Sequence, residues 1–328
     1  MSLLKSWKFW ALIAATIIWA RMPWLIRNNY QLQVLFRVTL FAGLGLAWNL
    51  VGGYAGQLSL GHVAFFGIGA YGFALFNTNL SVPLWLSLIL AALVATIVAG
   101  VIGMISFRLR GPYFTLATIA FGEVLRLIAT NLDVTGGAIG LTMPGLFHGR
   151  MFWRHFYLTA VALTVIAFIA NYWVSRSRFG YYLMAIREDE DTASAVGINT
   201  ARCKLWSLLI SAFLTALAGA LYGSAFQFIV PDSVLTLEIS VQIAIITMLG
   251  GAGTLLGPIV GAALLLSAQE IFKNQFRESH LLIYGILIVL VVLFLPEGIV
   301  GGLERLFRRK PQAPAAARQQ TALEGTAQ

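Results

Sequence analysis

Glu123 and Arg126 are the charged side chains whose spacing is most suggestive of chemistry. They lie in a mainly apolar sequence that follows Arg110-Gly111-Pro112. Proline favours the first turn of a helix, and residues three apart on a helix share a face, so carboxylate and guanidinium can pair. Charges at membrane depth are costly unless they are paired or hydrated, which makes them candidates for a solute path. A structural ion pair nearer the outer surface is the alternative, and the sequence leaves both readings open.

A glycine-rich stretch, with seven glycines between Gly52 and Gly72, also contains Ser59 and His62. Small residues allow another helix or a solute to approach the backbone. A break near residues 56–61 would expose backbone groups that are tolerated only inside protein or beside a water-filled path. Two explanations of this stretch therefore remain: close packing of helices, and lining of a solute path. We expect His62 to be a hydrogen-bonded helix-end residue, because no second histidine or carboxylate lies at metal-ligand spacing; no metal site is predicted.

These residues form two candidate sets. The candidate path consists of Ser59, His62, Thr115, Thr118, Glu123 and Arg126. The glycines expected at close helix contacts are Gly56, Gly61, Gly67, Gly69, Gly253 and Gly257. The stretch from Gly52 also loosely echoes the one from Gly250, as in transporters whose interrupted helices come from duplicated halves.

Residues 176–204 form a long, charged connection between apolar runs. Acidic residues suit the positive end of a short helix, small residues follow them, and glycine can end it. A short helix of this kind can dock into a groove on a partner protein, whereas the alternative is a solvated loop. The residues assigned to this helix are Arg187, Glu188, Asp189, Glu190, Asp191, Ala193, Ala195 and Gly197.

Several catalytic signatures are missing from the sequence. No Gly-Lys dipeptide occurs, which excludes ATP hydrolysis through a P-loop. His-Glu-x-x-His and Gly-x-Ser-x-Gly are also absent. The single cysteine, Cys203, has no partner for a disulfide. We therefore expect a chain that binds no cofactor and performs no bond chemistry itself.

Composition indicates the elements that position these residues. Hydrophobic residues make up 59% of 328 positions and charged residues 11%, which is far more apolar than a soluble domain. A membrane span needs roughly 20 apolar residues, so the chain has room for about ten helical spans. The sequence predicts an all-α polytopic membrane protein. Its expected spans are residues 9–26, 38–51, 59–76, 84–107, 113–131, 156–174, 205–226, 237–249, 258–272 and 281–295.

The distribution of Lys and Arg predicts the orientation. The net charge of +9 comes from clusters between apolar runs and at the C-terminus, which fits loops that face a cytoplasm rather than nucleic acid. With both termini inside, most of the basic residues fall on the cytoplasmic side. Arg21, Arg27 and Arg37 would lie in an outer hairpin, the weakest point of this topology. Residues 1–310 form the expected transmembrane domain, and 311–328 an expected disordered cytoplasmic tail.

Several motifs in order resemble the LivM-type permeases of branched-chain amino acid ABC importers. They include GYAGQLSLGH from Gly53, RGPYF from Arg110, FGEVLR from Phe121, AIREDE from Ala185 and LGGAGTLLGP from Leu249. The resemblance extends over roughly residues 43–302 and implies an ABC importer permease fold in which residues 187–197 form the coupling helix. It also implies a LivH-type permease beside this chain, two cytoplasmic ATPases that use ATP, and a periplasmic or extracellular substrate-binding protein.

The expected function is therefore import of branched-chain amino acids across the bacterial inner membrane by alternating access. Relatives that carry urea, other amino acids or organic acids leave the solute open. A secondary transporter that carries a proton on Glu123 or Glu270 is the second reading. A membrane-embedded enzyme is the third, although it lacks evident paired carboxylates or a histidine cluster.

Overall fold

The structure is a computed structural model that describes residues 18–26, 28–143, 145–147, 149, 151–276, 285, 286, 289, 293 and 298–307. Of these, residues 303–307 are described by their backbone only. Its elements, in chain order, are α2 (Asn29–Trp48), the π-helical turn η2 (Asn49–Tyr54), α3 (His62–Thr78), α4 (Leu84–Ser106), α5 (Pro112–Asn131), the 3-10 turn η3 (Asp133–Thr135), β1 (Leu141–Thr142), α6 (Phe152–Arg176), α7 (Arg178–Glu188), α8 (Glu190–Ala195), α9 (Thr200–Phe226), β2 (Phe228–Ile229), α10 (Pro231–Val234), α11 (Leu237–Gly251), α12 (Gly257–Phe276) and α14 (Gly298–Phe307).

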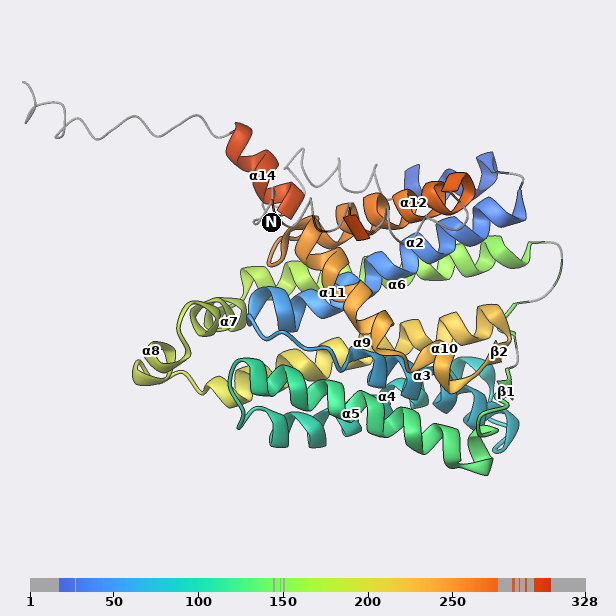
Figure 1. Cartoon of the computed structure of the whole chain (residues 1–328), viewed down its shortest axis with the longest axis horizontal. Helices are drawn as coiled ribbons and strands as arrows, with labels where there is room; N and C mark the ends of the chain where they lie inside the picture. The colour runs from blue at the N-terminus through green and yellow to red at the C-terminus, as the bar shows by residue number, and fades with distance from the viewer. Residues whose placement is uncertain are drawn as a thin grey trace, which may run out of the picture.

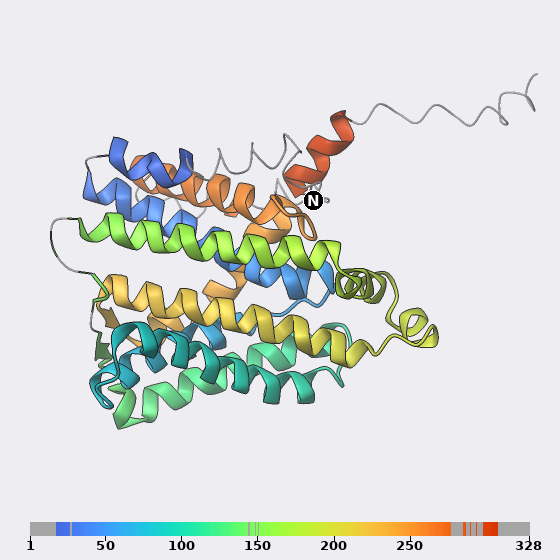
Figure 2. The same cartoon turned by 180° about the vertical axis from the view of Figure 1, so that it is seen from behind.

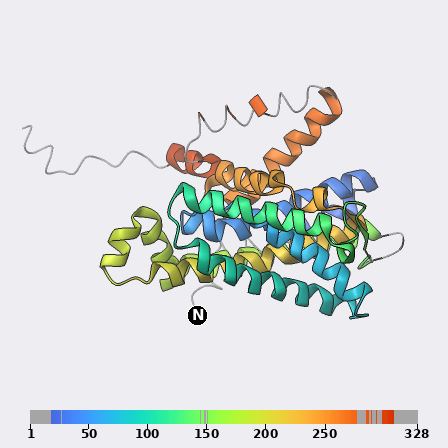
Figure 3. The ribbon, with the colours of Figure 1, turned by 60° about the horizontal axis from the view of Figure 1, so that its bottom comes forward.

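The long helices run side by side in one bundle, with different short elements at its two ends (Figure 1). At one end α7 and α8 project beyond the bundle, and the view from behind shows the same arrangement (Figure 2). At the other end β1 and β2 form an antiparallel pair in which Leu141 lies opposite Ile229. α12 packs along α2, and its C-terminal part leans away from the other helices (Figure 3). The candidate docking residues and the β pair therefore mark opposite ends of the molecule.

Within the described part of the chain, six helical stretches are long and apolar enough to cross a membrane. They cover Asn29–Tyr54, Leu84–Ser106, Pro112–Asn131, Phe152–Arg176, Thr200–Phe226 and Pro231–Gly251. α3 is shorter, with 17 residues, and α12 has 20 residues. The predicted all-α, membrane-spanning character is confirmed, while the count of about ten spans stays a prediction. Half of predicted span 9–26, most of predicted span 281–295 and all of the tail 311–328 lie outside the described residues.

α4 illustrates how the bundle packs. Its inner face is made largely of small residues, including Ser87, Ala91 and Ala95, all of them fully buried. Its outer face carries large exposed side chains such as Leu93 and Ile97. This is the arrangement expected in lipid, where small residues let helices approach and bulky apolar residues face the hydrocarbon.

The predicted start of the second span, at residue 38, is too late, and Arg37 does not lie in a loop as predicted. α2 begins at Asn29, with the Asn28 side chain capping it by accepting a hydrogen bond from the Tyr30 amide. The helix therefore starts nine residues before the predicted span at position 38, and Arg37 lies inside it. Hydropathy missed this start because the first turns carry asparagine, glutamine and arginine, which a capped helix accommodates at its end.

Candidate functional site

Helical structure is interrupted between α2 and α3, at the place where the glycines predicted a break. The π-helical turn η2 ends at Tyr54, and residues 55–61 are not helical before α3 begins at His62. Side chains from other segments satisfy the exposed backbone. The Trp48 indole donates to the Ser59 carbonyl at 2.7 Å. Irregular backbone at this depth survives because protein groups replace the missing helical hydrogen bonds.

α5 supplies the remaining partners of the interrupted segment. The Thr115 hydroxyl donates to the Leu58 carbonyl at 2.8 Å. The Leu60 amide donates to the Thr118 hydroxyl at 3.2 Å, and Thr118 in turn donates to the Thr115 carbonyl at 2.8 Å. Both threonines predicted for the path therefore contact the broken backbone directly, and they tie α5 to the start of α3.

His62 is fully buried at the first turn of α3 and is hydrogen-bonded through both ring nitrogens. Nδ1 lies 3.1 Å from the Ser59 hydroxyl, and Nε2 lies 2.8 Å from the Ser211 hydroxyl of α9. Ser211 already donates its proton to the Ala47 carbonyl at 2.6 Å, so it accepts from His62. The ring therefore carries a proton on Nε2 and joins three segments, as the helix-end prediction expected.

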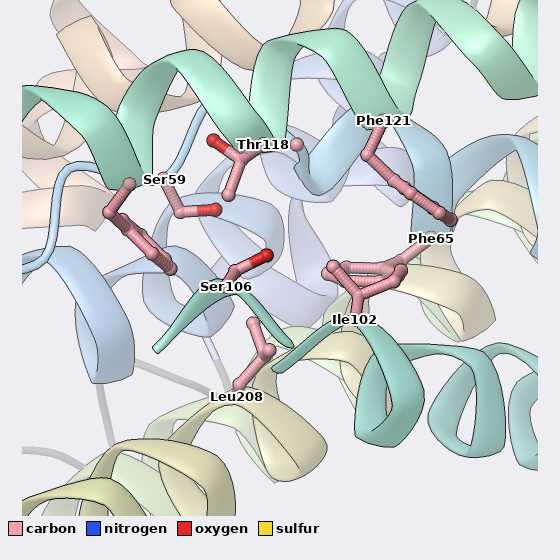
Figure 4. A pocket seen from close by; sticks show the side chains of 9 residues that line it. Ser59, Phe65, Ile102, Ser106, Thr118, Phe121 and Leu208 are labelled. Carbon is pink, nitrogen blue, oxygen red and sulfur yellow. The ribbon is translucent and has the colours of Figure 1, made fainter. Parts of the chain in front are cut away.

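A small, water-sized hollow lies between α3, α4, α5 and α9 (Figure 4). The hydroxyls of Ser59, Ser106 and Thr118 line it, opposite apolar side chains. Those apolar side chains are Phe65, Ile102, Phe114, Phe121 and Leu208, and Gly61 completes the wall. The sequence missed Ser106 and the aromatic residues, since nothing in their local spacing separates them from ordinary packing residues.

Glu123 and Arg126 do not line this hollow. They form the predicted i, i+3 ion pair at 2.6 Å, and the Arg126 guanidinium also contacts Asp232 of α10 at 2.6 Å. Arg126 is the most enclosed of the three side chains, with 27% of its surface exposed. The triad fastens α5 to α10, toward the end of the bundle that carries the β pair (Figure 1). The sequence missed Asp232 because it lies 106 positions from Arg126.

A second junction joins the two glycine-rich stretches to α7. The Gly253 amide donates to Asn49 Oδ1 at 2.8 Å, and Asn49 Nδ2 donates to the Thr254 carbonyl at 3.0 Å. At the same place, Arg187 Nη1 donates to the Gly53 carbonyl at 2.8 Å. The two stretches that echo each other in sequence therefore meet in space. Arg187 reaches into the bundle rather than only out to solvent.

The charged connection, residues 176–204, is largely helical, and its helices are divided differently from the prediction. Residues 187 and 188 complete α7, and Asp189 is extended and caps the separate helix α8 by accepting from the Thr192 amide at 2.5 Å. The helix is divided here because Asp189 follows the end of α7 and its side chain caps the first turn of α8. Gly197 follows α8 with a φ of +92°, a conformation that suits glycine.

The two acidic residues of α8 have different partners. Glu190 pairs at 2.5 Å with Lys204, whose side chain is completely buried. Asp191 pairs at 2.7 Å with Arg110, and both of these side chains are mostly exposed. Ala193 is buried against the bundle, whereas Ala195 and Gly197 are exposed. Glu190 therefore anchors α8, and the exposed residues leave a surface at this end of the molecule.

The glycines predicted at helix contacts lie against other chain segments. A Cβ at Gly69 would be 2.1 Å from the Ala216 carbonyl oxygen of α9, and one at Gly67 would be 2.1 Å from the Leu235 side chain. The other four are tight as well: Gly56 and Gly253 against Arg187, Gly61 against Thr118, and Gly257 against Gly251.

The bundle of apolar helices, with bulky residues outside and an interrupted helix within, defines a multi-pass integral membrane protein. The chain belongs to the family described as "Branched-chain amino acid transport system / permease component", whose model matches residues 30–292. It is 31% identical to the LivM permease protein of the high-affinity branched-chain amino acid transport system of Salmonella typhimurium, over 88% of this chain and 74% of that protein.

Two further relatives place the chain within this family. The corresponding LivM protein of Escherichia coli K12 is 31% identical with the same coverage. The LivH permease protein of the same organism is 25% identical, over 83% of this chain and 96% of its own length. The resemblance predicted from the motifs is thereby confirmed.

Proposed function

We propose that this chain is the LivM-type translocation subunit of an ATP-driven importer for leucine, isoleucine and valine. The observation that carries the proposal is the family match over residues 30–292, together with 31% identity to LivM proteins. The geometry adds a physical link between the inner end and the interrupted helix. The chain itself binds no cofactor and hydrolyses no ATP, because partner subunits supply that chemistry.

In this proposal α7 and α8 form the coupling element that the ATPases move. The exposed end of α8 around Ala195 and Gly197 is the docking surface. Glu190 and its buried partner Lys204 transmit displacement to α9. Arg187 transmits it to the Gly53 carbonyl, in the turn that precedes the broken segment. The arrangement offers two connections from one docking surface into the bundle.

The proposed solute path runs beside the broken segment. Ser59 and Thr118 line the hollow of Figure 4, and His62 and Thr115 hold the adjoining backbone. Their hydroxyl and imidazole hydrogen bonds would be rearranged as α5 shifts against α3. Glu123 and Arg126 hold α5 to α10 at the outer side and belong to the path only through that positioning.

The complete importer would contain two cytoplasmic ABC ATPases, a LivH-type permease beside this chain and an external binding protein that delivers the solute. The complex would lie in the bacterial inner membrane, with both termini of this chain in the cytoplasm. α8 would then face the ATPases, and the β1–β2 pair the binding protein.

Reconstitution tests the proposal. The complex in proteoliposomes, supplied with binding protein, should take up leucine, isoleucine and valine only when ATP reaches the ATPases. Arg187→Gln should retain assembled ATPases but lower uptake about tenfold or more, because a hydrogen bond from a charged group contributes about 1.5–3 kcal/mol. Arg178→Gln, an equal charge change at an exposed position of α7, is the matched control and should leave uptake unchanged. Equal uptake by the two variants would contradict the coupling role of Arg187.

A gradient-driven transporter is the competing function. Uptake that persists without ATP and stops when the proton gradient is dissipated would replace the importer proposal. The ion triad around Arg126 makes Glu123 a poor proton carrier, because the Arg126 guanidinium already occupies its carboxylate.

A further inference from the structure

In the described part of the chain, α5 is the least buried of the six helical stretches that can cross a membrane, and it is also the least apolar. Only 22% of its most apolar stretch is buried, against 33% for α4. If lipid covered both helices, the more exposed one should be at least as apolar as the other, because hydrocarbon offers no partners for polar groups. The opposite holds: α4 has the highest mean hydropathy of the six, and α5 has the lowest. The exposed face of α5 is therefore not suited to lipid.

The difference comes from particular side chains on the two exposed faces. The face of α4 carries bulky apolar residues such as Leu93 and Ile97. The face of α5 carries Ala120 and Glu123 among its apolar residues. Glu123 is the twelfth of the twenty residues of α5, well inside the span, and 50% of its side chain is exposed. A carboxylate at this depth needs protein or water beside it.

The ion triad leaves this face with an excess of negative charge. Two carboxylates, those of Glu123 and Asp232, share the guanidinium of Arg126, so the two negative charges and one positive charge sum to −1. Asp232 is the more open of the two acids, with 75% of its side chain exposed. An ionised carboxylate accepts several hydrogen bonds, so both acids have capacity for a further donor.

The exposed side of α5 also has the geometry of a helix-packing surface. It includes a straight row formed by Tyr113, Leu116, Ala120, Glu123 and Leu127. Successive members are three, four, three and four positions apart, which is the spacing with which one helix packs along another. Ala120, in the middle of the row, lets a second backbone approach closely. α5 itself lies at the surface of the bundle (Figures 1 and 3).

We propose that this row of α5, with the ion triad beside it, is the surface on which the LivH-type permease packs. The partner contributes a helix along the row and presents a basic or hydrogen-bond-donating side chain to Glu123 and Asp232. The identity of the partner rests on the proposed function. The unsuitability of this face for lipid does not.

A second copy of this chain fits the surface less well than a different permease. In a two-fold dimer the same patch of each copy meets itself. The two triads would then face each other with a charge of −1 each, and like charges across an interface repel. A related permease with a different sequence can supply the complementary charge instead.

Photo-crosslinking in the complete importer tests which molecule covers α5. The photoreactive residue p-benzoylphenylalanine replaces either Leu116 of α5 or Ile97 of α4, which are similarly exposed, at 61% and 68%. On illumination, position 116 should form an adduct with the co-expressed LivH-type permease, and position 97 an adduct with lipid alone. An adduct of position 116 with lipid alone, or with a second copy of this chain, would overturn the proposal.

Added volume at the row tests the contact itself. Ala120→Trp should lower the amount of LivH-type permease that copurifies with the chain about tenfold or more, because it overpacks a close contact. It should leave thermal unfolding of the chain alone unchanged, since Ala120 is exposed there. Val101→Trp, at an exposed position of α4, is the control and should change neither measurement.

The outcomes separate this surface from the proposed function. Undiminished copurification with Ala120→Trp would refute the surface. If ATP-driven uptake of leucine persists in that variant as well, the importer proposal stands without it. If the LivH-type permease does not copurify even with the unmodified chain, both the proposed function and this surface fail.

Discussion

Glu190 and Asp191 are adjacent acidic residues whose substitution should have very different consequences. Glu190→Gln removes the charge that faces Lys204, a side chain with no exposed surface, at 2.5 Å. Among the described residues, the Lys204 ammonium then faces the Phe107 ring, 6.0 Å from its centroid, and a neutral amide. Breaking a buried ion pair from one side costs about 3–5 kcal/mol. Because Glu190 itself is 21% exposed, we expect the lower end, about 3 kcal/mol.

Asp191→Asn is the matched control. Its pair with Arg110 has side chains that are 65% and 75% exposed, and such pairs contribute below about 1 kcal/mol. Since 1.4 kcal/mol is a factor of ten, Glu190→Gln should raise the opening of α8 roughly a hundredfold, and Asp191→Asn less than about fivefold. Adding Lys204→Met to Glu190→Gln should recover much of the loss, because the unpaired buried charge is then gone.

Amide hydrogen exchange of residues 189–199 in the detergent-solubilised chain measures this opening. The reasoning would be refuted by equal exchange in Glu190→Gln and Asp191→Asn. It would also be refuted if adding Lys204→Met to Glu190→Gln gave no recovery.

Three further predictions concern caps and contacts. Gly69→Ala should lower stability by about 1–3 kcal/mol in thermal unfolding, because its Cβ would lie 2.1 Å from the Ala216 carbonyl, whereas Gly100→Ala, with Leu209 at 3.5 Å, should be neutral or stabilising. Thr118→Val should cost about 1–3 kcal/mol by leaving the Leu60 amide unpaired; Thr96→Val, which loses only a bond within its own helix, is the comparison. Hydrogen bonds from Thr192 hold the pKa of the Asp189 carboxyl below its usual range. The ionised cap therefore stabilises α8 above the ordinary aspartate pKa, and this stabilisation is lost as the pH falls through the lowered pKa. Asp189→Asn should make α8 exchange insensitive to pH there; a slope identical to that of the unmodified chain would contradict the cap.

Local patterns in the sequence predicted the elements that depend on neighbours in the chain. Spacing alone indicated the Glu123–Arg126 pair, since three residues on a helix bring side chains together. Glycine density indicated the interruption before His62. The motifs, as a set, indicated the family.

Long-range partners could not be predicted in the same way. Nothing near Arg187 indicates that its guanidinium reaches the Gly53 carbonyl, 134 positions earlier. Arg37 was misplaced because a hydropathy window treats arginine as a loop residue, whereas α2 holds it within a packed helix. For α8, a signal was present: aspartate three positions before Thr192 is a cap pattern that an acidic run conceals.

The small inner residues of α4 and the close glycines of α3 imply that the positions sensitive to mutation differ from those of a soluble protein. Where backbones touch, as at Gly69 and Ala216, the interior has few side-chain atoms that truncation could remove. In a soluble core the damaging change is usually deletion of methylene groups. Here added volume should be the damaging change: a comprehensive substitution scan should find these positions sensitive to every larger residue, while the bulky outward positions of α4 accept almost any apolar replacement.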